Sequence, residues 1–485
     1  VSATTLYGDG TNITGVGATI APLFYQPDPY DSGVVLDAGI GITFNSQLKA
    51  GTGNVTLSIA NAGVAGTVVE NFGVGSSVSI SENRITINPT ADLSVGGDYI
   101  ISYPSGCFTN NEGTDYVGTA YTFQARPLEN QLWMWGHGSE GALAQNNTVD
   151  YSSPVQVPGN WSSGVILRHS SSAISLGKLY TWGDNSEGQL GQNQGSLKIS
   201  SPVQVGSDSN WNKLYASGSY TAYATKTDGT LWGWGANSSG KLAQNTGPSV
   251  AYSSPIQIPG TWSTVCNTQL GGNFAGGIKT DGTLWLWGKN EEGQIGNNQR
   301  LNDGYSSPIQ IPGTTWSHVS GGQYITVATK TDGTAWAWGK SDWGQLGQND
   351  RTTRSSPVQI PGTSWASIDA GERGAGGVKT DGTLWMWGYN GYGSLGKNNE
   401  TNYSSPVQIP GTNWSTSVDQ LMVGQYVTMA MKTDGTLWSW GYNNKGQAGL
   451  NFTGDRSSPI QIPGTEWTSI EHSIYQSAMA IKTPT

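Results

Sequence analysis

The carboxylates of this sequence are the side chains best suited to acid–base chemistry, and most of them recur at one place in a repeated motif. Five aspartates precede a glycine in Lys-Thr-Asp-Gly-Thr, at Asp228, Asp281, Asp332, Asp381 and Asp434. Asp-Gly between two strand-like runs predicts a two-residue type I′ hairpin turn, so we assign these acids a turn role. Outside the motif stand Glu291, Glu292 and Asp342, which could form a glycosidase pair if two carboxyl groups lay about 5 to 9 Å apart.

Other reactive groups are sparse. The four histidines, His137, His169, His318 and His472, show no metal-ligand spacing. The two cysteines, Cys107 and Cys266, lie far apart in the sequence, which favours two isolated buried thiols. The sequence has no Gly-x-Ser-x-Gly, no His-Glu-x-x-His and no phosphate-binding loop with a lysine. We therefore expect no catalytic residue, no metal site and no cofactor, and a protein that is not an enzyme.

The composition is typical of an all-β protein with many turns. The 485 residues include 70 Gly and 21 Trp, only 12% of them are charged, and the formal net charge is -10. An acidic chain without a basic run does not favour a nucleic-acid partner, because phosphate binding needs clustered Lys and Arg. No apolar run reaches the ~20 residues of a membrane-spanning helix, so we expect no membrane insertion.

Internal repeats are the main structural signal of the sequence. The element Leu-Trp-x-Trp-Gly or a close variant occurs seven times, at intervals of 47 to 53 residues, with its second tryptophan at Trp135, Trp182, Trp234, Trp287, Trp338, Trp387 and Trp440. Ser-Pro-Val/Ile-Gln follows each copy, and then a further tryptophan, at Trp161, Trp211, Trp262, Trp316, Trp365, Trp414 and Trp467. Each repeat thus contains four strand-like runs within ~50 residues, which is the pattern of one β-propeller blade.

The two ends of the repeat region complement each other. The region begins in mid-repeat at Leu132, and it ends with 478–483, which is the half-repeat missing at the start. We therefore predict a seven-bladed propeller that is closed by pairing of its first and last strands, because closure leaves no exposed sheet edge.

Tryptophan has two possible roles in such a chain. Twenty of the 21 tryptophans belong to the repeated elements, so we interpret them as packing between blades rather than as platforms for sugar stacking. Trp343 stands outside the period, in a predicted loop, and Tyr389, Tyr392 and Tyr442 stand in the corresponding loops after Trp-Gly. Aromatic loop residues are common in recognition surfaces, so these four are our candidate contact residues.

The first part of the chain lacks the repeat. Apolar and polar residues alternate in 41–44, 54–59 and 84–87, with turn-forming residues between them, which predicts short strands. We predict an N-terminal arm or linker at 1–20, an immunoglobulin-like β-sandwich at 21–126 and the propeller at 127–485.

Two resemblances extend this picture. The segment 182–191, Trp-Gly-Asp-Asn-Ser-Glu-Gly-Gln-Leu-Gly, resembles the repeat of the regulator-of-chromosome-condensation family, and the likeness covers about 128–485. It implies a rigid ring whose variable loops bind another macromolecule. Segments 42–57 and 87–102 resemble bacterial immunoglobulin-like domains of the S-layer type, which implies a spacer or adhesion module of cell surfaces and virions.

These features favour a non-enzymatic structural and adhesive protein of an extracellular assembly, such as a bacteriophage virion appendage or tail protein. The sandwich would anchor the chain, and the propeller would present its loops. The expected partners are other virion or surface-layer proteins and a host-surface glycan or receptor, with several copies of the chain in one assembly. Two alternatives remain open, namely a secreted protein-binding or inhibitor module and a polysaccharide-acting enzyme.

Overall fold

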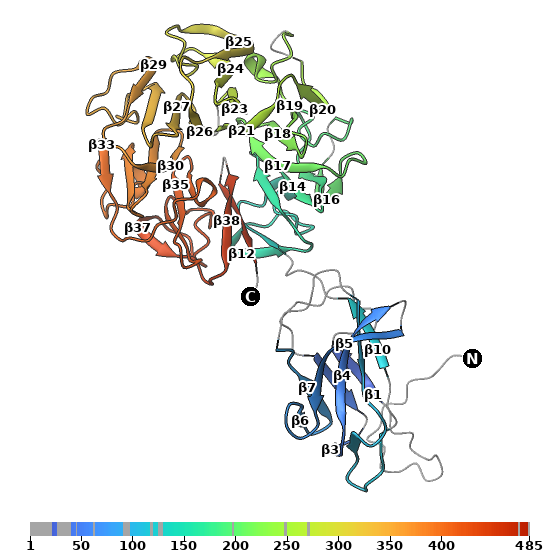
Figure 1. Cartoon of the computed structure of the whole chain (residues 1–485). Helices are drawn as coiled ribbons and strands as arrows, with labels where there is room; N and C mark the ends of the chain where they lie inside the picture. The colour runs from blue at the N-terminus through green and yellow to red at the C-terminus, as the bar shows by residue number, and fades with distance from the viewer. Residues whose placement is uncertain are drawn as a thin grey trace. The chain divides into compact units, whose positions relative to one another are not determined.

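The computed structural model describes residues 22–26, 40–44, 46–61, 64–90, 98–116, 120–124, 130–195, 198–246, 250–268, 272–473 and 476–483. The predicted N-terminal arm at 1–20 lies outside these residues, as do residues 125–129, which include the predicted domain boundary between 126 and 127. Contacts divide the chain into two compact units, Val1–Glu129 and Asn130–Pro484. Both units consist of strands, so the all-β prediction is confirmed (Figure 1). In the described part of the chain, no helix is long and apolar enough to cross a membrane.

The first unit contains two four-stranded sheets that share one core. One sheet has the order β1 (Pro22–Gln26), β2 (Ile40–Phe44), β7 (Arg84–Ile87), β6 (Ser79–Ser81). The other has the order β10 (Ala120–Gln124), β8 (Asp98–Ser102), β4 (Asn54–Asn61), β5 (Val64–Gly73), and β3 (Lys49–Ala50) pairs with β9 (Phe108–Thr109). Apolar side chains of both sheets, such as Ile42 and Leu57, are buried in one cluster with Phe44 and Tyr116. This is the layered arrangement that alternating strands predict.

The second unit repeats one four-stranded antiparallel sheet. The plan is shown by β17 (Trp211–Ala216), β18 (Thr221–Lys226), β19 (Leu231–Gly235) and β20 (Tyr252–Ile258), which are neighbours in chain order. Equivalent sheets are β13 (Ser163–Ile166) to β16 (Ile199–Gln204), with β14 (Ser170–Ser175) and β15 (Lys178–Gly183); β21 (Trp262–Val265), β23 (Phe274–Lys279), β24 (Leu284–Asn290) and β25 (Leu301–Gln310); and β26 (Trp316–Gly321), β27 (Ile325–Lys330), β28 (Ala335–Gly339) and β29 (Arg354–Gln359). Two more are β30 (Trp365–Ala370), β31 (Gly374–Lys379), β32 (Leu384–Gly388) and β33 (Tyr403–Gln408); and β34 (Leu421–Val423), β35 (Val427–Met431), β36 (Leu437–Gly441) and β37 (Arg456–Gln461). The short β22 (Asn267–Thr268) pairs in parallel with β26.

The remaining sheet joins strands from the two ends of the unit. Its order is β12 (Tyr151–Val157), β11 (Gln131–Gly136), β39 (Ser477–Lys482), β38 (Trp467–Ser473), which continues into β13. In the pairing of β11 with β39, Leu132 lies opposite Ile481 and Trp135 lies opposite Ala478. The half-repeats at the two ends therefore share backbone hydrogen bonds, as their sequences predict.

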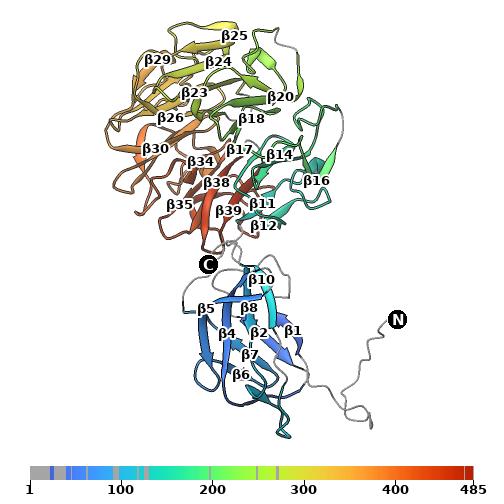
Figure 2. The same ribbon diagram turned by 45° about the vertical axis from the view of Figure 1, so that its right-hand side comes forward.

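The sheets are arranged radially. In Figures 1 and 2 the first strand of each sheet, such as β17 or β26, lies toward the centre, and the fourth, such as β20 or β29, lies toward the rim. We call the end that carries the first-to-second and third-to-fourth strand connections the loop end. The other end, with the Asp-Gly turns and the Pro-Gly segments, is the turn end.

The predicted type I′ geometry of the Asp-Gly turns is wrong. Of the two central residues only the glycine has a positive φ, which is 79° at Gly229, and Lys226 N–H donates to the Thr230 carbonyl at 3.0 Å. The loop therefore has three residues and ends on a left-handed glycine. The Asp228 carboxylate accepts hydrogen bonds from the Thr230 amide at 2.9 Å and hydroxyl at 2.7 Å, which holds the aspartate at negative φ.

The repeated tryptophans pack between sheets, as predicted. The second tryptophan of each Leu-Trp-x-Trp-Gly element is fully buried, and its Nε1 donates to a backbone carbonyl of the preceding sheet's loop; Trp387 Nε1, for example, lies 2.9 Å from the Gln345 carbonyl oxygen. The first tryptophan of the element instead bonds within its own sheet, as Trp336 does to the Thr334 hydroxyl at 2.9 Å. Both cysteines are buried and free, as expected.

Candidate functional site: an aromatic arc and a central pocket

The four candidate aromatic residues lie side by side at the loop end. The ring centroids of Trp343 and Tyr389 are 5.1 Å apart, and those of Tyr392 and Tyr442 are 4.7 Å apart. Tyr426 joins the two pairs, at 6.3 Å from Tyr389 and 5.2 Å from Tyr392. We call these five residues the aromatic arc. The structure thus brings together all four side chains that the sequence singled out and adds a fifth.

The backbone beneath the arc is held by the repeat. Tyr389 N–H donates to the Arg373 carbonyl at 2.9 Å, and Tyr442 N–H donates to the Tyr426 carbonyl at 2.9 Å. The Asn390 side chain fixes the loop that follows, because its Oδ1 accepts from Leu395 N–H at 2.8 Å and its Nδ2 donates to the Asn399 carbonyl at 2.8 Å. The rings are therefore presented by an ordered loop rather than by a flexible one.

One cation lies at the centre of the arc. The Arg373 guanidinium carbon lies 5.8 Å from the Tyr389 ring centroid and 6.0 Å from that of Tyr426. Its Nε donates to Glu372 Oε1 at 3.0 Å, and burial raises the pKa of Glu372, whereas the Arg373 charge lowers it. The arc residues are half-buried apart from Tyr392, which is 39% exposed. The arrangement offers ring edges, phenol hydroxyls and a guanidinium to a partner.

The neighbouring part of the loop end carries histidines and charged side chains in place of tyrosine and tryptophan. The His137 and His169 rings are 6.0 Å apart, and Ser139 Oγ lies 3.3 Å and 3.0 Å from their Nδ1 atoms. Ion pairs surround them: Lys198 to Glu140 at 2.6 Å and Lys445 to Asp150 at 3.1 Å. Burial lowers the pKa of both histidines. We call the set His137, Glu140, Asp150, His169 and Lys198 the charged arc.

The acids considered for catalysis are bound to lysines. Glu292 and Asp342 both lie 3.2 Å from Lys340 Nζ, and Glu291 lies 2.7 Å from Lys289 Nζ. These acids form surface ion pairs rather than a free pair of carboxyl groups. Among the described residues, no group of three or more His, Cys, Asp or Glu side chains is placed to hold a metal ion.

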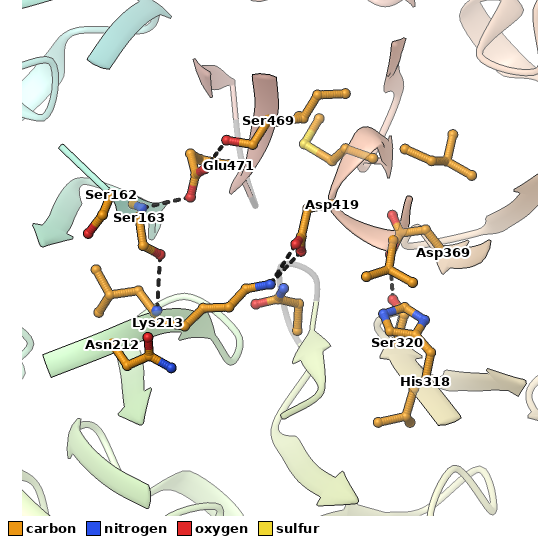
Figure 3. A pocket seen from close by; sticks show the side chains of 18 residues that line it. Ser162, Ser163, Asn212, Lys213, His318, Ser320, Asp369, Asp419, Ser469 and Glu471 are labelled. Carbon is orange, nitrogen blue, oxygen red and sulfur yellow. Dashed lines mark hydrogen bonds and ion pairs between the residues drawn. The ribbon is translucent and has the colours of Figure 1, made fainter. Parts of the chain in front are cut away.

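The second candidate site is a cavity at the centre of the turn end. The first strands of the sheets and η4 (Val418–Gln420) surround a cavity of about 280 Å³. Figure 3 shows the Lys213 side chain reaching across it to Asp419, whose two carboxylate oxygens lie 2.6 and 2.7 Å from Lys213 Nζ. Glu471 and Asp369 line the same cavity. The pocket is therefore polar and contains an ion pair.

The two deeper carboxyl groups bind neighbouring strands. Glu471 accepts from Gly164 N–H at 2.6 Å and from the Ser469 hydroxyl at 2.6 Å. Asp369 accepts from Val423 N–H at 2.6 Å and from the Ser320 hydroxyl at 2.5 Å. These bonds connect β38 to β13 and β30 to β34. The pocket acids therefore hold successive first strands together and are not poised toward a reacting group.

Burial dominates the electrostatics of this pocket. It raises the pKa of Asp369 to about 7 and that of Glu471 to about 7. Burial also lowers the pKa of His318 to about 4, and in the part of the chain that the structure describes its Nδ1 has no hydrogen-bond partner. Perturbed pKa values of this kind occur both in active sites and in structural networks. Here the hydrogen bonds of both acids to backbone N–H groups favour the structural role.

Sequence reasoning missed Tyr426, Arg373 and the central pocket. The signal was present as departures from the repeat: two residues after the third-element tryptophan most repeats have Ser or Thr, whereas Lys213 and His318 stand there in two of them. Four residues after it stand Asp369 and Glu471, where others have Val165 or Cys266. A column-by-column comparison of the repeats would have marked these positions.

Comparison with known proteins identifies both units. Residues 19–125 match the bacterial Ig-like domain family, and residues 131–480 match the RCC1-like domain family. The chain is 26% identical to the ultraviolet-B receptor UVR8 of Arabidopsis thaliana over 235 residues, which are 48% of this chain and 52% of the receptor. It is 30% identical to the protein RCC2 homolog of Danio rerio over 126 residues, 25% of each chain. The chain thus spans about half or less of the length of these relatives.

Solved structures show the same propeller fold. Human WBSCR16 superposes with a TM-score of 0.63 at 19% identity, over 73% of this chain and 99% of that one. Prp20p of Saccharomyces cerevisiae superposes with a TM-score of 0.62 at 16% identity, over 74% of this chain and 92% of that one. At such identities the likeness concerns the fold alone. Because the match at 131–480 covers more than half of the sequence, the chain belongs to the RCC1-like domain family, with a bacterial Ig-like domain before its propeller.

Proposed function

We propose that this chain is a non-catalytic binding protein of an extracellular assembly, in which the aromatic arc contacts a partner protein. The observation that carries the proposal is the arc itself, five aromatic rings in contact with one another, most of them edge to face, with Arg373 beside two of them. Trp, Tyr and Arg are the residue types that dominate binding energy at protein interfaces.

The repeat does not require these rings. The positions of Tyr389 and Tyr392 are occupied by Ala236 and Ser239 in the equivalent loop of another repeat, and both loops form the same short 3-10 turn, with positive φ at Tyr392 and at Ser239. A side chain that the framework can replace by Ala or Ser does not stabilise the framework. The arc is therefore best explained by a partner, and the ordered backbone beneath it lowers the entropy cost of binding.

The second part of the proposal is that the propeller holds the aromatic arc on a rigid support. We propose that the propeller is a closed seven-bladed ring; the pairing of β11 with β39 and the side-chain bonds between successive first strands support this. The immunoglobulin-like unit is proposed to mount the ring on a virion appendage or a bacterial surface layer, where several copies together would strengthen weak contacts. A protein partner also agrees with Prp20p, whose structure was described with its binding to Gsp1p and histones.

Localisation of the full chain tests the proposal. Antibody against the propeller, with gold labelling of purified virions and of cell envelopes, should mark one of these assemblies. Label confined to the culture medium would instead favour the secreted inhibitor module, and label confined to the cell interior would contradict an extracellular role. Release of reducing sugar from host polysaccharide by the purified protein would contradict the non-catalytic assignment.

A further inference from the structure

The third-element tryptophans differ from the other repeated tryptophans in one respect. Within the described residues, the buried indole Nε1 atoms of six of them have no hydrogen-bond partner: Trp211, Trp262, Trp316, Trp365, Trp414 and Trp467. Trp161, the seventh, donates to the Val157 carbonyl at 3.1 Å. A buried N–H donor without an acceptor is costly, so its repetition needs an explanation.

Two of these indoles line clear cavities. A groove of about 390 Å³ contains Trp316, Trp336, Lys330 and Pro312. The equivalent groove at Trp414 measures about 350 Å³ and has the same kinds of residue in its wall. In the first groove Lys330 Nζ lies 4.7 Å from the ring centroids of both tryptophans. Each groove thus combines an ammonium group, an indole N–H, and apolar walls of tryptophan and proline.

A glycine leaves space where the two donors converge. A Cβ atom built on Gly313 would lie 3.5 Å from Lys330 Nζ and 3.6 Å from Trp316 Nε1, with no closer atom. At Gly362 the corresponding distances, to Lys379 Nζ and Trp365 Nε1, are 3.4 and 4.0 Å. Both donors therefore face one unfilled point beside the glycine, and an acceptor atom near that point would contact both.

The chain itself shows which acceptor suits this position. In the last repeat Glu466 follows Pro-Gly-Thr and pairs with Lys482 at 3.3 Å. In an earlier repeat Asp208 pairs with the equivalent Lys226 at 2.7 Å. These two repeats supply a carboxylate of their own to the lysine beside the tryptophan.

Four consecutive repeats lack that carboxylate. In the first of them, that of Trp262 and Lys279, the segment before the tryptophan is one residue shorter, and a Cβ on Gly260 would lie only 3.2 Å from Trp262 Nε1, so less room remains there.

The other three repeats have the wider opening. The position of Glu466 is taken by Thr315, Ser364 and Asn413, and none of their lysines, Lys330, Lys379 and Lys432, has an ion pair among the residues described. The nearest acid of the first groove, Asp332, is occupied by the Thr334 amide at 2.9 Å and hydroxyl at 2.6 Å. We call these three sites the open grooves.

We propose that each open groove binds the carboxylate of an acidic sugar residue in a polysaccharide. A carboxylate can accept from both the ammonium and the indole N–H, and a charge-assisted hydrogen bond is the stronger kind. The tryptophan and proline walls suit the apolar face of a sugar ring. Three grooves in consecutive sheets suit a polymer that repeats its carboxylate, because linked weak sites add affinity. This inference is independent of the aromatic arc, which lies at the loop end.

Titration of the full chain with a short oligogalacturonate, followed by calorimetry, tests the proposal. The methyl ester of the same oligomer is the matched probe, since it keeps the ring and removes the charge. We expect the acid to bind at least about tenfold more tightly than the ester, which is the loss expected for one charge-assisted hydrogen bond. Equal affinity of the acid and the ester would overturn the proposal, and so would full competition by acetate, which would reveal a non-specific anion site.

Substitutions at the Glu466 position provide a graded control, with monomeric galacturonate as the probe for counting sites. Thr315→Glu should fill the first open groove from within and lower the stoichiometry by one site. Glu466→Thr should open the groove at Lys482 and raise it by one. Both residues have positive φ, 68° at Thr315 and 72° at Glu466, and Thr315 itself shows that this position accepts a threonine. Unchanged stoichiometry in both variants, with unchanged melting temperatures, would contradict the assignment.

Lysine-to-glutamine variants test whether the ammonium groups of the open grooves are needed for binding. Replacement of Lys330, Lys379 and Lys432 by Gln should abolish binding of oligogalacturonate. Lys226→Gln is the matched control, because its lysine is already paired with Asp208 at 2.7 Å, and it should leave binding unchanged. Loss of binding in the control alone would overturn the proposal.

Discussion

The aromatic arc and the charged arc occupy equivalent positions of the same repeated loop. Directly after Trp-Gly stand Tyr389 and Tyr442 in one and His137 in the other. Three residues later stand Tyr392 and, in the charged arc, Glu140, both at positive φ of 64° and 59°. The loops of Glu140 and Tyr392 thus share one backbone geometry, and their side chains differ. The framework therefore fixes where a surface residue lies, whereas the chemistry of its side chain varies between repeats.

The largest expected effect is the loss of the central ring of the aromatic arc. Tyr426→Ser removes the ring that lies 6.3, 5.2 and 6.1 Å from those of Tyr389, Tyr392 and Tyr442. If the arc is a hot spot, binding of labelled full chain to the assembly that carries its partner should weaken by about 30-fold or more, which is about 2 kcal/mol.

The matched control is His169→Ser in the charged arc. His169 stands at the same first-to-second strand connection, where its carbonyl accepts from Asp184 N–H at 2.8 Å, as the Tyr426 carbonyl accepts from Tyr442 N–H at 2.9 Å. Equal losses for both variants would show that the two arcs do not differ in function.

The next largest effect is expected on stability rather than on partner binding, from a substitution of Lys241 in the repeated loop framework. Lys241 stands where Gln189, Gln294 and Gln345 stand in other repeats, and burial lowers its pKa to about 7. The folded state therefore binds fewer protons than the unfolded state between pH 7 and 10.5, so stability rises with pH through that window. Lys241→Gln removes this cost and should stabilise the fold by about 2 kcal/mol at pH 7.

Urea unfolding of wild type and variant at several pH values measures this. The advantage of the glutamine variant should shrink steadily toward pH 10. A variant that is less stable than wild type at pH 7 would show that the ammonium group has a favourable role that its hydrogen bonds, at 3.4 Å to Ser217 and Asn273, do not reveal.

A smaller effect is expected at Glu471 in the central pocket. Its pKa is raised from 4.5 to about 7, so the folded state binds more protons than the unfolded state in this window, and stability falls as pH rises through it. Glu471→Gln keeps an acceptor for Gly164 N–H and removes the titration. At pH 8 the variant should therefore be more stable than wild type by about 1 kcal/mol, and near pH 4 the two should be alike.

Two other pocket groups also make stability depend on pH: the raised pKa of Asp369 lowers stability as pH rises, whereas the lowered pKa of His318 raises it. Both groups titrate in wild type and in the variant, so the difference between their unfolding free energies reports on Glu471 alone. A difference that grows toward low pH would contradict this account. Unchanged partner binding in the variant is also expected, because the central pocket and the aromatic arc lie at opposite ends of the propeller.

The smallest effect should come from Arg373→Lys. Lysine keeps the charge beside Glu372 and loses the planar group, whose carbon lies 5.8 and 6.0 Å from two arc rings. Partner binding should weaken by about threefold to tenfold, with little change in stability. Wild-type affinity in this variant would show that only the positive charge matters.

The sequence predicted the framework well, because each blade repeats local signals. Paired tryptophans, Ser-Pro-x-Gln runs and Asp-Gly turns each mark a strand or a turn within a few residues. The turn type was wrong at Asp228, since the side-chain bonds to Thr230 that fix it depend on the neighbouring residue. Strand alternation also indicated the sandwich of the first unit.

The sites were only partly predictable. Trp343 and the three loop tyrosines were chosen one by one as unpatterned loop aromatics, and their contact arises because adjacent sheets bring equivalent loops together. Tyr426 lies in a short turn without a motif, so no local signal marked it. Lys213 and Asp419 are 206 residues apart, and their ion pair forms because elements from distant repeats line the same central pocket. Contacts between residues so distant in the sequence depend on how the sheets are placed relative to one another, so local sequence patterns do not predict them.

Footprinting by hydroxyl radicals, of the full chain free and bound to the virions or envelopes that carry it, would show whether the aromatic arc contacts the partner. Protection on binding should fall on the five residues of the arc, Trp343, Tyr389, Tyr392, Tyr426 and Tyr442, while His137 and His169 should remain as reactive as in the free protein. Protection confined to the charged arc, or to the immunoglobulin-like unit with the aromatic arc unchanged, would contradict the proposed contact.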